Sequence, residues 1–176
     1  GVAFGVGDFL HDHPHWSLFV DKGDLKWSDF RSWHASGVIT SASLLASLPK
    51  RQIAQLNVPI VAFGGPDTAK KGSRWPTVMS DHIKIGEMAA EYLINQGLKQ
   101  FAFCGPEEVG GVPWWLMRVE GFARRLSSSG FDYTLYKPSK SLEAWSKRQA
   151  ALGQWIRSLE KPVGIMAFFD ERAREL

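Results

Sequence analysis

The sequence has one cysteine, no long apolar run and no block of like charges. Cys104 alone excludes an internal disulfide framework and a zinc site built on paired cysteines, and it is typical of a reducing, cytoplasmic setting. No apolar stretch approaches the roughly 20 residues that a membrane helix needs. The first residues show neither a basic segment nor a long apolar segment, so we expect no secretion signal and no contact with a membrane.

The charge is also close to balance, because 21 Lys and Arg residues face 18 Asp and Glu residues, for a net charge of +3. A nucleic-acid-binding surface usually gathers its basic residues on one face, and this balance does not predict one. The basic stretch 66–76 is interpreted as a solvated surface loop. Eight tryptophans are more than a chain of 176 residues normally carries, and Trp is favoured both in cores and at binding surfaces.

Seven short apolar runs alternate with amphipathic stretches along the chain. Most of the runs are apolar throughout, which is typical of parallel strands covered by helices on both faces. Their spacing of about thirty residues predicts stacked βαβ units, and therefore an α/β fold. The predicted strands are 16–20, 37–40, 58–64, 77–80, 101–105, 133–136 and 163–169.

Helical periodicity fills the intervals between these runs. Ser80 or Asp81 can cap the helix that contains 85–93, and Gly97 can end it. Gly130 can close the next helix in the same way. The predicted helices are 1–10, 49–56, 85–93, 119–126 and 142–159, with the opening turn of another at 171–176.

Three charged residues follow predicted strands, at the edge where doubly wound sheets bind ligands. Asp81 follows 77–80, Arg118 opens the helix after 101–105, and Asp170 closes 163–169. Carboxylates accept hydrogen bonds from neighbouring hydroxyls, and a planar guanidinium donates to two oxygens. Such a set matches a polyhydroxylated ligand.

Tryptophans lie near the same strand ends, and their faces can stack on the C–H face of a sugar ring. These are Trp114, Trp115 and Trp145. An alternative interpretation remains open, in which Asp81 is only a helix cap and Arg118 only a surface cation.

Other chemistries have weaker support. The alternating His11, His13 and His15 with Asp12 are interpreted as a polar loop rather than a metal site. Neither the neighbouring Glu107 and Glu108 nor the glycines at 105, 110 and 111 complete a hydrolase or phosphate-loop motif. Cys104 is expected to be a buried, inert thiol. We therefore expect no metal, no cofactor and no enzymatic activity.

Taken in order, these residues resemble a known family. The pattern Asp81-x4-Gly86-x2-Ala89-x2-Tyr92-Leu93, followed by Arg118-x2-Gly121-Phe122 and by Asp170 after an apolar strand, resembles the sugar-sensing domain of the lactose/galactose-repressor family. The details are more similar to the xylose-operon regulators of the AraC type. The features shared with that branch are 5–10 leading into 16–19, 101–105, Trp114 four residues before Arg118, Trp145 with Trp155, 162–165 and 170–174.

The resemblance implies a periplasmic-binding-protein type I fold, with two Rossmann-like βαβ lobes of parallel strands that are incomplete at both ends. The lobes would be 1–80 and 81–176. It also implies that Asp81, Arg118 and Asp170 contact the sugar, and that Arg172 matches an arginine of the xylose branch. It further implies that the protein forms a homodimer. It also implies that DNA is bound through a separate C-terminal helix-turn-helix module, which is not in this sequence.

We therefore expect a sensing domain that binds a pentose such as xylose between two lobes, with Asp81, Arg118, Asp170, Arg172, Trp114 and Trp145 as ligand-binding residues. Two alternatives stay open. A transport binding protein shares the fold, and the start of the natural gene would identify it. A sugar isomerase or nucleoside-handling α/β enzyme would turn over its ligand.

Overall fold

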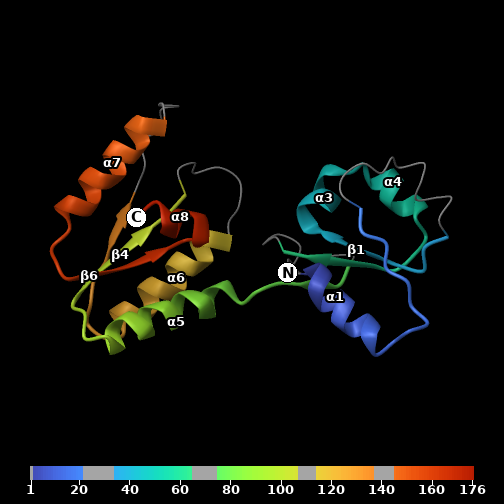
Figure 1. Ribbon diagram of the computed structural model, residues 1–176, viewed down its shortest axis with the longest axis horizontal. Coiled ribbons are helices and arrows are strands. Elements are labelled where there is room, and N and C mark those ends of the chain that lie inside the picture. The colour runs from blue at the N-terminus through green and yellow to red at the C-terminus, as the bar shows by residue number, and fades with distance from the viewer. Residues whose placement is uncertain (1, 22–33, 65–74, 107–113, 137–144) are drawn as a thin grey trace.

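A computed structural model describes residues 2–21, 34–64, 75–106, 114–136 and 145–176 of the chain. Two three-stranded parallel sheets organise these residues (Figure 1). The first has the order β1-β2-β3, with β1 at Val38–Ser41, β2 at Ile60–Phe63 and β3 at Thr77–Val78. The second has the order β5-β4-β6, with β4 at Gln100–Cys104, β5 at Thr134–Tyr136 and β6 at Val163–Ala167.

Helices connect the strands. Those of the first part are α1 (Val2–His11), α3 (Ala42–Ser47) and α4 (Lys50–Gln55). Those of the second part are α5 (His82–Asn95), α6 (Trp114–Ser127), α7 (Trp145–Ser158) and α8 (Asp170–Arg174). Among the described residues, no helix is both long and apolar enough to span a membrane.

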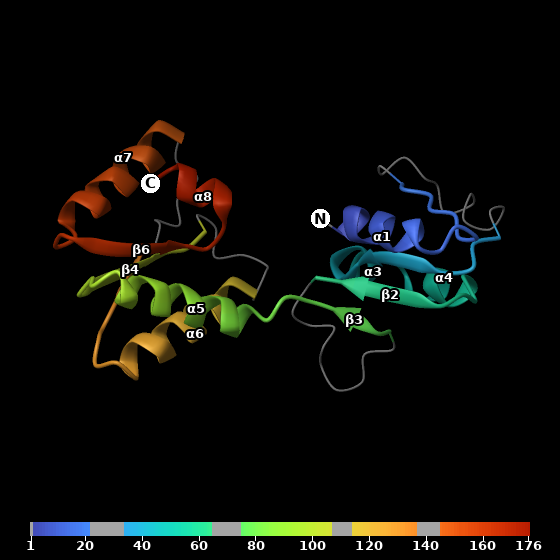
Figure 2. The ribbon, with the colours of Figure 1, turned by 60° about the horizontal axis from the view of Figure 1, so that its bottom comes forward.

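The second sheet is the middle of three layers, with α5 and α6 on one face and α7 and α8 on the other (Figure 2). Alternate residues of β4 serve the two faces. Phe103 packs with Phe122 of α6 in one cluster, and Cys104 packs with Leu152 of α7 in another. A strand covered on both faces must be apolar throughout, which is why the pattern of 101–105 predicts it correctly.

The first sheet has a smaller core. Ala42 and Leu45 of α3 and Ile53 of α4 pack against Ile60 and Ala62 of β2. By contrast, α1 contains no buried residue. The apolar side chains of α3 and α4 therefore form the core of this sheet. The side chains of α1 contribute no buried residue to it.

The boundaries of α5 and α6 follow from their end residues. The Asp81 carboxylate accepts a hydrogen bond of 2.9 Å from the backbone N–H of Lys84 and so caps α5. Gly97 and Gly130 have φ values of 79° and 77° just beyond the two helices. This left-handed conformation favours glycine and ends a helix, as the sequence predicts.

Two glycines allow α5 and α6 to touch backbone to backbone. A Cβ on Gly86 of α5 would lie 2.1 Å from the Arg118 carbonyl oxygen of α6. A Cβ on Gly121 of α6 would lie 2.0 Å from the Ile83 carbonyl oxygen of α5. Real side chains cannot approach so closely, so the crossing requires glycine at both positions.

One prediction of local structure is wrong, and one helix was not predicted. The run 16–20 is not a strand, because none of the described strands pairs with it, and most of its apolar side chains are exposed. In addition, α3 was not predicted. Its six residues are too few for a helical period to show in the sequence, and Ser41 caps it by accepting a 3.2 Å hydrogen bond from the Leu44 N–H.

The remaining predicted strands each contain or overlap a strand of the structure. The helices predicted at 1–10, 49–56, 85–93, 119–126 and 171–176 correspond to α1, α4, α5, α6 and α8. The last predicted helix, 142–159, corresponds to α7 from Trp145 onward, and residues 142–144 lie outside the described residues.

The crossing of α5 and α6 gives a stability prediction. Gly86→Ala should lower the free energy of unfolding by about 1–3 kcal/mol, because the added methyl group forces two backbones apart. Gly153→Ala in α7 is the matched control, since its Cβ would meet only the Arg157 side chain at 3.5 Å. That control should gain about 0.5–1 kcal/mol from helix propensity. Urea unfolding measures both, and equal midpoints for the two variants would contradict the account.

Candidate functional site

The carboxyl edge of the second sheet lies on the side of the second part that faces the first part of the chain (Figure 1). Because β3 ends at Val78 and α5 begins at His82, the chain passes from the first sheet to the second part directly at this edge. The first turns of α6 and α8 follow β4 and β6, so they mark the carboxyl edge of the second sheet. Figure 1 shows these helix starts on the side of the second part that faces the first.

Arg118 is the centre of a group of side chains at this edge. Its Nε donates a 3.3 Å hydrogen bond to Nδ1 of His82, and its Nη1 donates to the carbonyl oxygen of Phe168. These bonds join α6 to the start of α5 and to the residue after β6. The guanidinium is therefore held by two elements other than its own helix.

Trp114 covers the Arg118 guanidinium. The indole lies 4.7 Å from Cζ of Arg118, a distance typical of a cation–π contact. The same ring stacks on Phe168 at 5.8 Å between centroids and lies 5.4 Å from the ring of His82. Trp114 and Arg118 are four residues apart on α6, so both side chains lie on the same side of the helix.

The structure corrects one detail of the prediction. Arg118 does not open its helix, because α6 already includes Trp114. The sequence reasoning recognised the buried residues Phe122 and Leu126 later in the helix, but not the first turn, whose large aromatic residues interrupt the helical pattern. Arg118 is half-buried rather than a freely solvated cation.

The two predicted carboxylates lie at the rim of this group, and both are exposed. Asp81 caps α5 and is the neighbour of His82. Asp170 is the first residue of α8. Burial lowers the pKa of Arg118, and the nearby Asp170 carboxylate raises it in part. The structure therefore brings Asp81, Arg118, Asp170 and Trp114 to one edge.

His82 is a member of the group that the sequence analysis missed. It is only 8% exposed although it lies at the start of α5. Burial lowers its pKa below 6.5, the Arg118 guanidinium lowers it further, and Asp81 raises it in part. A neutral imidazole can accept a hydrogen bond at Nδ1. In the sequence, its position next to the predicted cap Asp81 is a signal that could have placed His82 in the site. No sequence pattern marks the Phe168 carbonyl as the second partner of Arg118.

Arg172 lies in a different environment. It is 3% exposed, pairs with Glu175, and places its guanidinium 5.4 Å from the ring of Tyr136. Burial lowers its pKa, but the hydrogen bond to Glu175 and the neighbouring Cys104 raise it, and the net direction is upward. Since Cys104 and Tyr136 end β4 and β5, Arg172 lies over the carboxyl ends of these strands, inside the fold.

The other two tryptophans differ from Trp114. Trp115 packs against the core cluster that contains Phe103 and Phe122. Trp145 is the first residue of α7 and is 65% exposed. Trp145 makes no ring contact with the Arg118 group within the described part of the chain.

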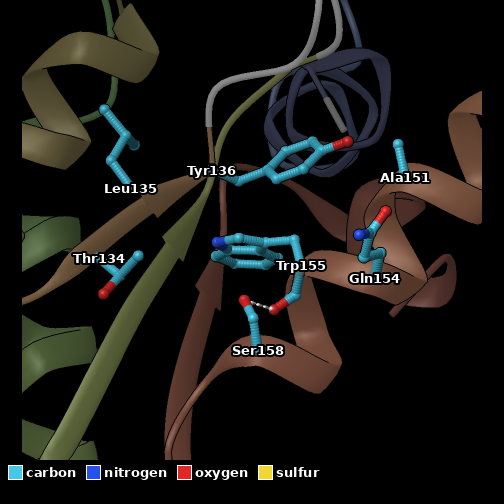
Figure 3. A pocket seen from close by; sticks show the side chains of 7 residues that line it. All are labelled: Thr134, Leu135, Tyr136, Ala151, Gln154, Trp155 and Ser158. Carbon is cyan, nitrogen blue, oxygen red and sulfur yellow. Dashed lines mark hydrogen bonds between the residues drawn. The ribbon is translucent and has the colours of Figure 1, made fainter.

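A hollow of about 510 Å³ lies elsewhere, between β5 and α7 (Figure 3). Trp155 forms its floor beneath the ring of Tyr136, and none of the six predicted ligand-binding residues lines it. The lining residues are Thr134, Leu135, Tyr136, Ala151, Gln154, Trp155 and Ser158.

The weaker motifs of the sequence do not form a second site in what the structure describes. Within the described ranges, no three His, Cys, Asp or Glu side chains gather as metal ligands, His11, His13 and His15 included. Cys104 is fully buried. The basic stretch 66–76 lies mostly outside the described residues, as do Glu107, Glu108 and the glycines at 110 and 111.

Comparison with known proteins supports the same kind of fold. Residues 90–176 match the family described as periplasmic binding protein-like domain. The chain is 31% identical over 179 residues to the xylose operon regulatory protein of Haemophilus influenzae and 28% identical over 181 residues to that of Escherichia coli K12. These alignments cover 99% of this chain but 46% and 45% of the relatives. The chain thus spans less than half the length of the curated relatives it matches.

A solved structure of a xylose-binding transcription activator superimposes with a TM-score of 0.78 and 26% identity, covering 99% of this chain and 44% of that one. The predicted periplasmic-binding-protein-like α/β fold is therefore confirmed, as is the resemblance to xylose-operon regulators. By their names, these relatives are regulators of the xylose operon or of transcription.

The burial of His82 predicts a pH-dependent stability. Its pKa is lower in the folded chain than the ordinary 6.5, so the unfolded chain binds more protons between the two values. The contribution of neutral His82 is complete above about pH 6.5 and is lost as the pH falls through the folded-state pKa. Urea unfolding from about pH 8 to about pH 5 should show this loss.

His82→Asn is the comparison for this measurement, because it removes the titrating ring and leaves the other four histidines in place. Its stability should decline less than that of the parent on acidification. Parallel stability curves for the parent and His82→Asn would contradict the assignment of a buried, neutral His82.

Proposed function

We propose that this chain, with the periplasmic-binding-protein-like fold that it shares with xylose operon regulators, is the sensing part of a sugar-responsive transcription regulator. Its ligand is a pentose such as xylose. The observation that carries the proposal is the Arg118 group, in which α5, α6 and the end of β6 present a held guanidinium, an aromatic face and carboxylates at one sheet edge. The names of the relatives, which refer to xylose, support the choice of ligand.

The chemistry of the group fits a sugar. Asp81 and Asp170 accept hydrogen bonds from hydroxyls, and Arg118 donates to hydroxyl oxygens. Trp114 offers an aromatic face beside them. Arg172 and Trp145 complete the proposed set, with Arg172 acting from its buried position over β4 and β5 and Trp145 from the exposed start of α7.

The proposed site lies between two lobes, 1–80 and 81–176, each built on one of the two sheets. Sugar would bind the closed arrangement of the lobes better than the open one, so binding shifts the population toward closure. That shift would change how a homodimer presents its DNA-binding modules, which is the coupling that a sensor needs. In this proposal the DNA contact belongs to a separate C-terminal helix-turn-helix module.

The proposal includes no reaction, no metal and no cofactor. It places the protein in the cytoplasm, where a transcription regulator meets DNA. A covalent hydrolase needs a nucleophile activated by an adjacent general base, whereas the Arg118 group presents a half-buried cation and two exposed carboxylates that suit hydrogen bonds to hydroxyls.

Arg118→Ala should weaken xylose binding at least about tenfold, because a charge-assisted hydrogen bond contributes roughly 1.5–3 kcal/mol and 1.4 kcal/mol corresponds to one decade. Arg118→Lys should also bind weakly, since an ammonium group cannot reproduce the planar guanidinium. Titration calorimetry on the full-length protein measures both.

Arg124→Ala is the matched control, because Arg124 lies on the same helix but pairs with Glu87 at the exposed surface. Its affinity for xylose should equal that of the parent. If Arg118→Ala binds xylose as tightly as Arg124→Ala, the proposed site is wrong.

Xylose should also change the intrinsic fluorescence of the protein, because the Trp114 ring would exchange water for a sugar face. Trp114→Phe should lose most of this change, and Trp155→Phe, in the hollow beside β5, should keep it. An unchanged spectrum in a sample that binds xylose by calorimetry would remove Trp114 from the site.

A further inference from the structure

Two of the three guanidinium nitrogens of Arg118 are occupied by the protein itself. Nε donates to Nδ1 of His82, and Nη1 donates to the Phe168 carbonyl oxygen. Within the described residues, Nη2 makes no hydrogen bond with a side chain or carbonyl group. Since the guanidinium is planar, fixing two nitrogens also fixes the direction of the third.

His82 is buried beside the arginine that it contacts. It follows the Asp81 cap as the first residue of α5, and it is 8% exposed. His82 and Gly86 are one turn apart on α5, so both lie on the side that meets α6. The contact of Gly86 with the Arg118 backbone therefore sets the distance between the imidazole and the guanidinium.

We propose that His82 is a positioning residue of the sugar site, which accepts from Arg118 Nε through neutral Nδ1 and thereby turns Nη2 toward the ligand. The inference rests on the proposed function, since it assigns a role in the same site. His82 acts through Arg118 and is not itself required to touch the sugar.

The protonation state of His82 then controls the position of Arg118. A protonated imidazole carries N–H groups at both nitrogens and cannot accept from Nε. The charged groups that act on the His82 ring are Asp81, which caps α5, and Arg118 on α6, while Asp170 at the start of α8 and the Phe168 carbonyl act on Arg118. Burial and the Arg118 charge both favour the neutral ring, and Asp81 opposes them in part. Acidification would replace the hydrogen bond by repulsion between two cations.

The test compares His82→Asn with His82→Leu by xylose titration calorimetry on the full-length protein. The asparagine side-chain oxygen can replace Nδ1 as an acceptor and does not titrate, whereas leucine removes the acceptor. At about pH 7.5, His82→Leu should bind xylose at least about fivefold more weakly than the parent, and His82→Asn should stay within about twofold of it.

The pH profile separates positioning from a merely structural role. Between about pH 8 and about pH 5, the affinity of the parent should fall as His82 is protonated, while His82→Asn should show a flatter profile. His15→Leu, which changes an exposed histidine, should follow the parent. Thermal melts show whether His82→Leu folds, and if it does not, the profile of His82→Asn decides alone.

Two outcomes would overturn the inference. In one, His82→Leu binds xylose as tightly as the parent. In the other, His82→Asn and the parent have the same pH profile. Arg118→Ala, titrated in parallel, distinguishes the causes: if it is weak while His82→Leu is normal, only the positioning role fails. If Arg118→Ala also binds normally, the proposed sugar site fails with it.

Discussion

The backbone contact between α5 and α6 is the constraint on which the candidate site depends. Gly86 and Gly121 leave no side chain between the helices, so the Arg118 carbonyl and the Ile83 carbonyl approach the opposite helix directly. The two helices start at the ends of strands from different sheets. Their contact therefore brings the start of α5, which leaves the first sheet, against the start of α6, which leaves the second.

This geometry explains why a cation can be both half-buried and available to a ligand. Arg118 donates one hydrogen bond to His82 and one to the Phe168 carbonyl, and its guanidinium contacts the face of Trp114. Together these interactions offset the loss of water around its charge. The carboxylates of Asp81 and Asp170 stay exposed at the rim, where charge costs little. The hollow beside β5 lacks such a charge among its lining residues, so it offers volume without the chemistry of the Arg118 group.

Much of the fold could be predicted because its buried strands are apolar throughout and its main helices carry a clear period. Asp81, Gly97 and Gly130 mark helix ends by local chemistry, which a sequence displays directly. The run 16–20 looks like a strand for the same reasons, but strand formation also needs a paired neighbour, which composition does not reveal. Likewise, Asp81, Arg118 and Asp170 could be placed at strand ends. The role of His82, however, depends on the crossing of α5 and α6, which brings it to Arg118, 36 residues away along the chain.

The central claim is that a pentose binds at the carboxyl edge of the second sheet, against Arg118. A crystal structure of the full-length protein with bound xylose tests it most directly. The account predicts the sugar within hydrogen-bond distance of the Arg118 guanidinium, beside the ring of Trp114, with His82 Nδ1 still accepting from Nε. Xylose bound elsewhere, for instance in the hollow above Trp155, with no contact to Arg118, would contradict it.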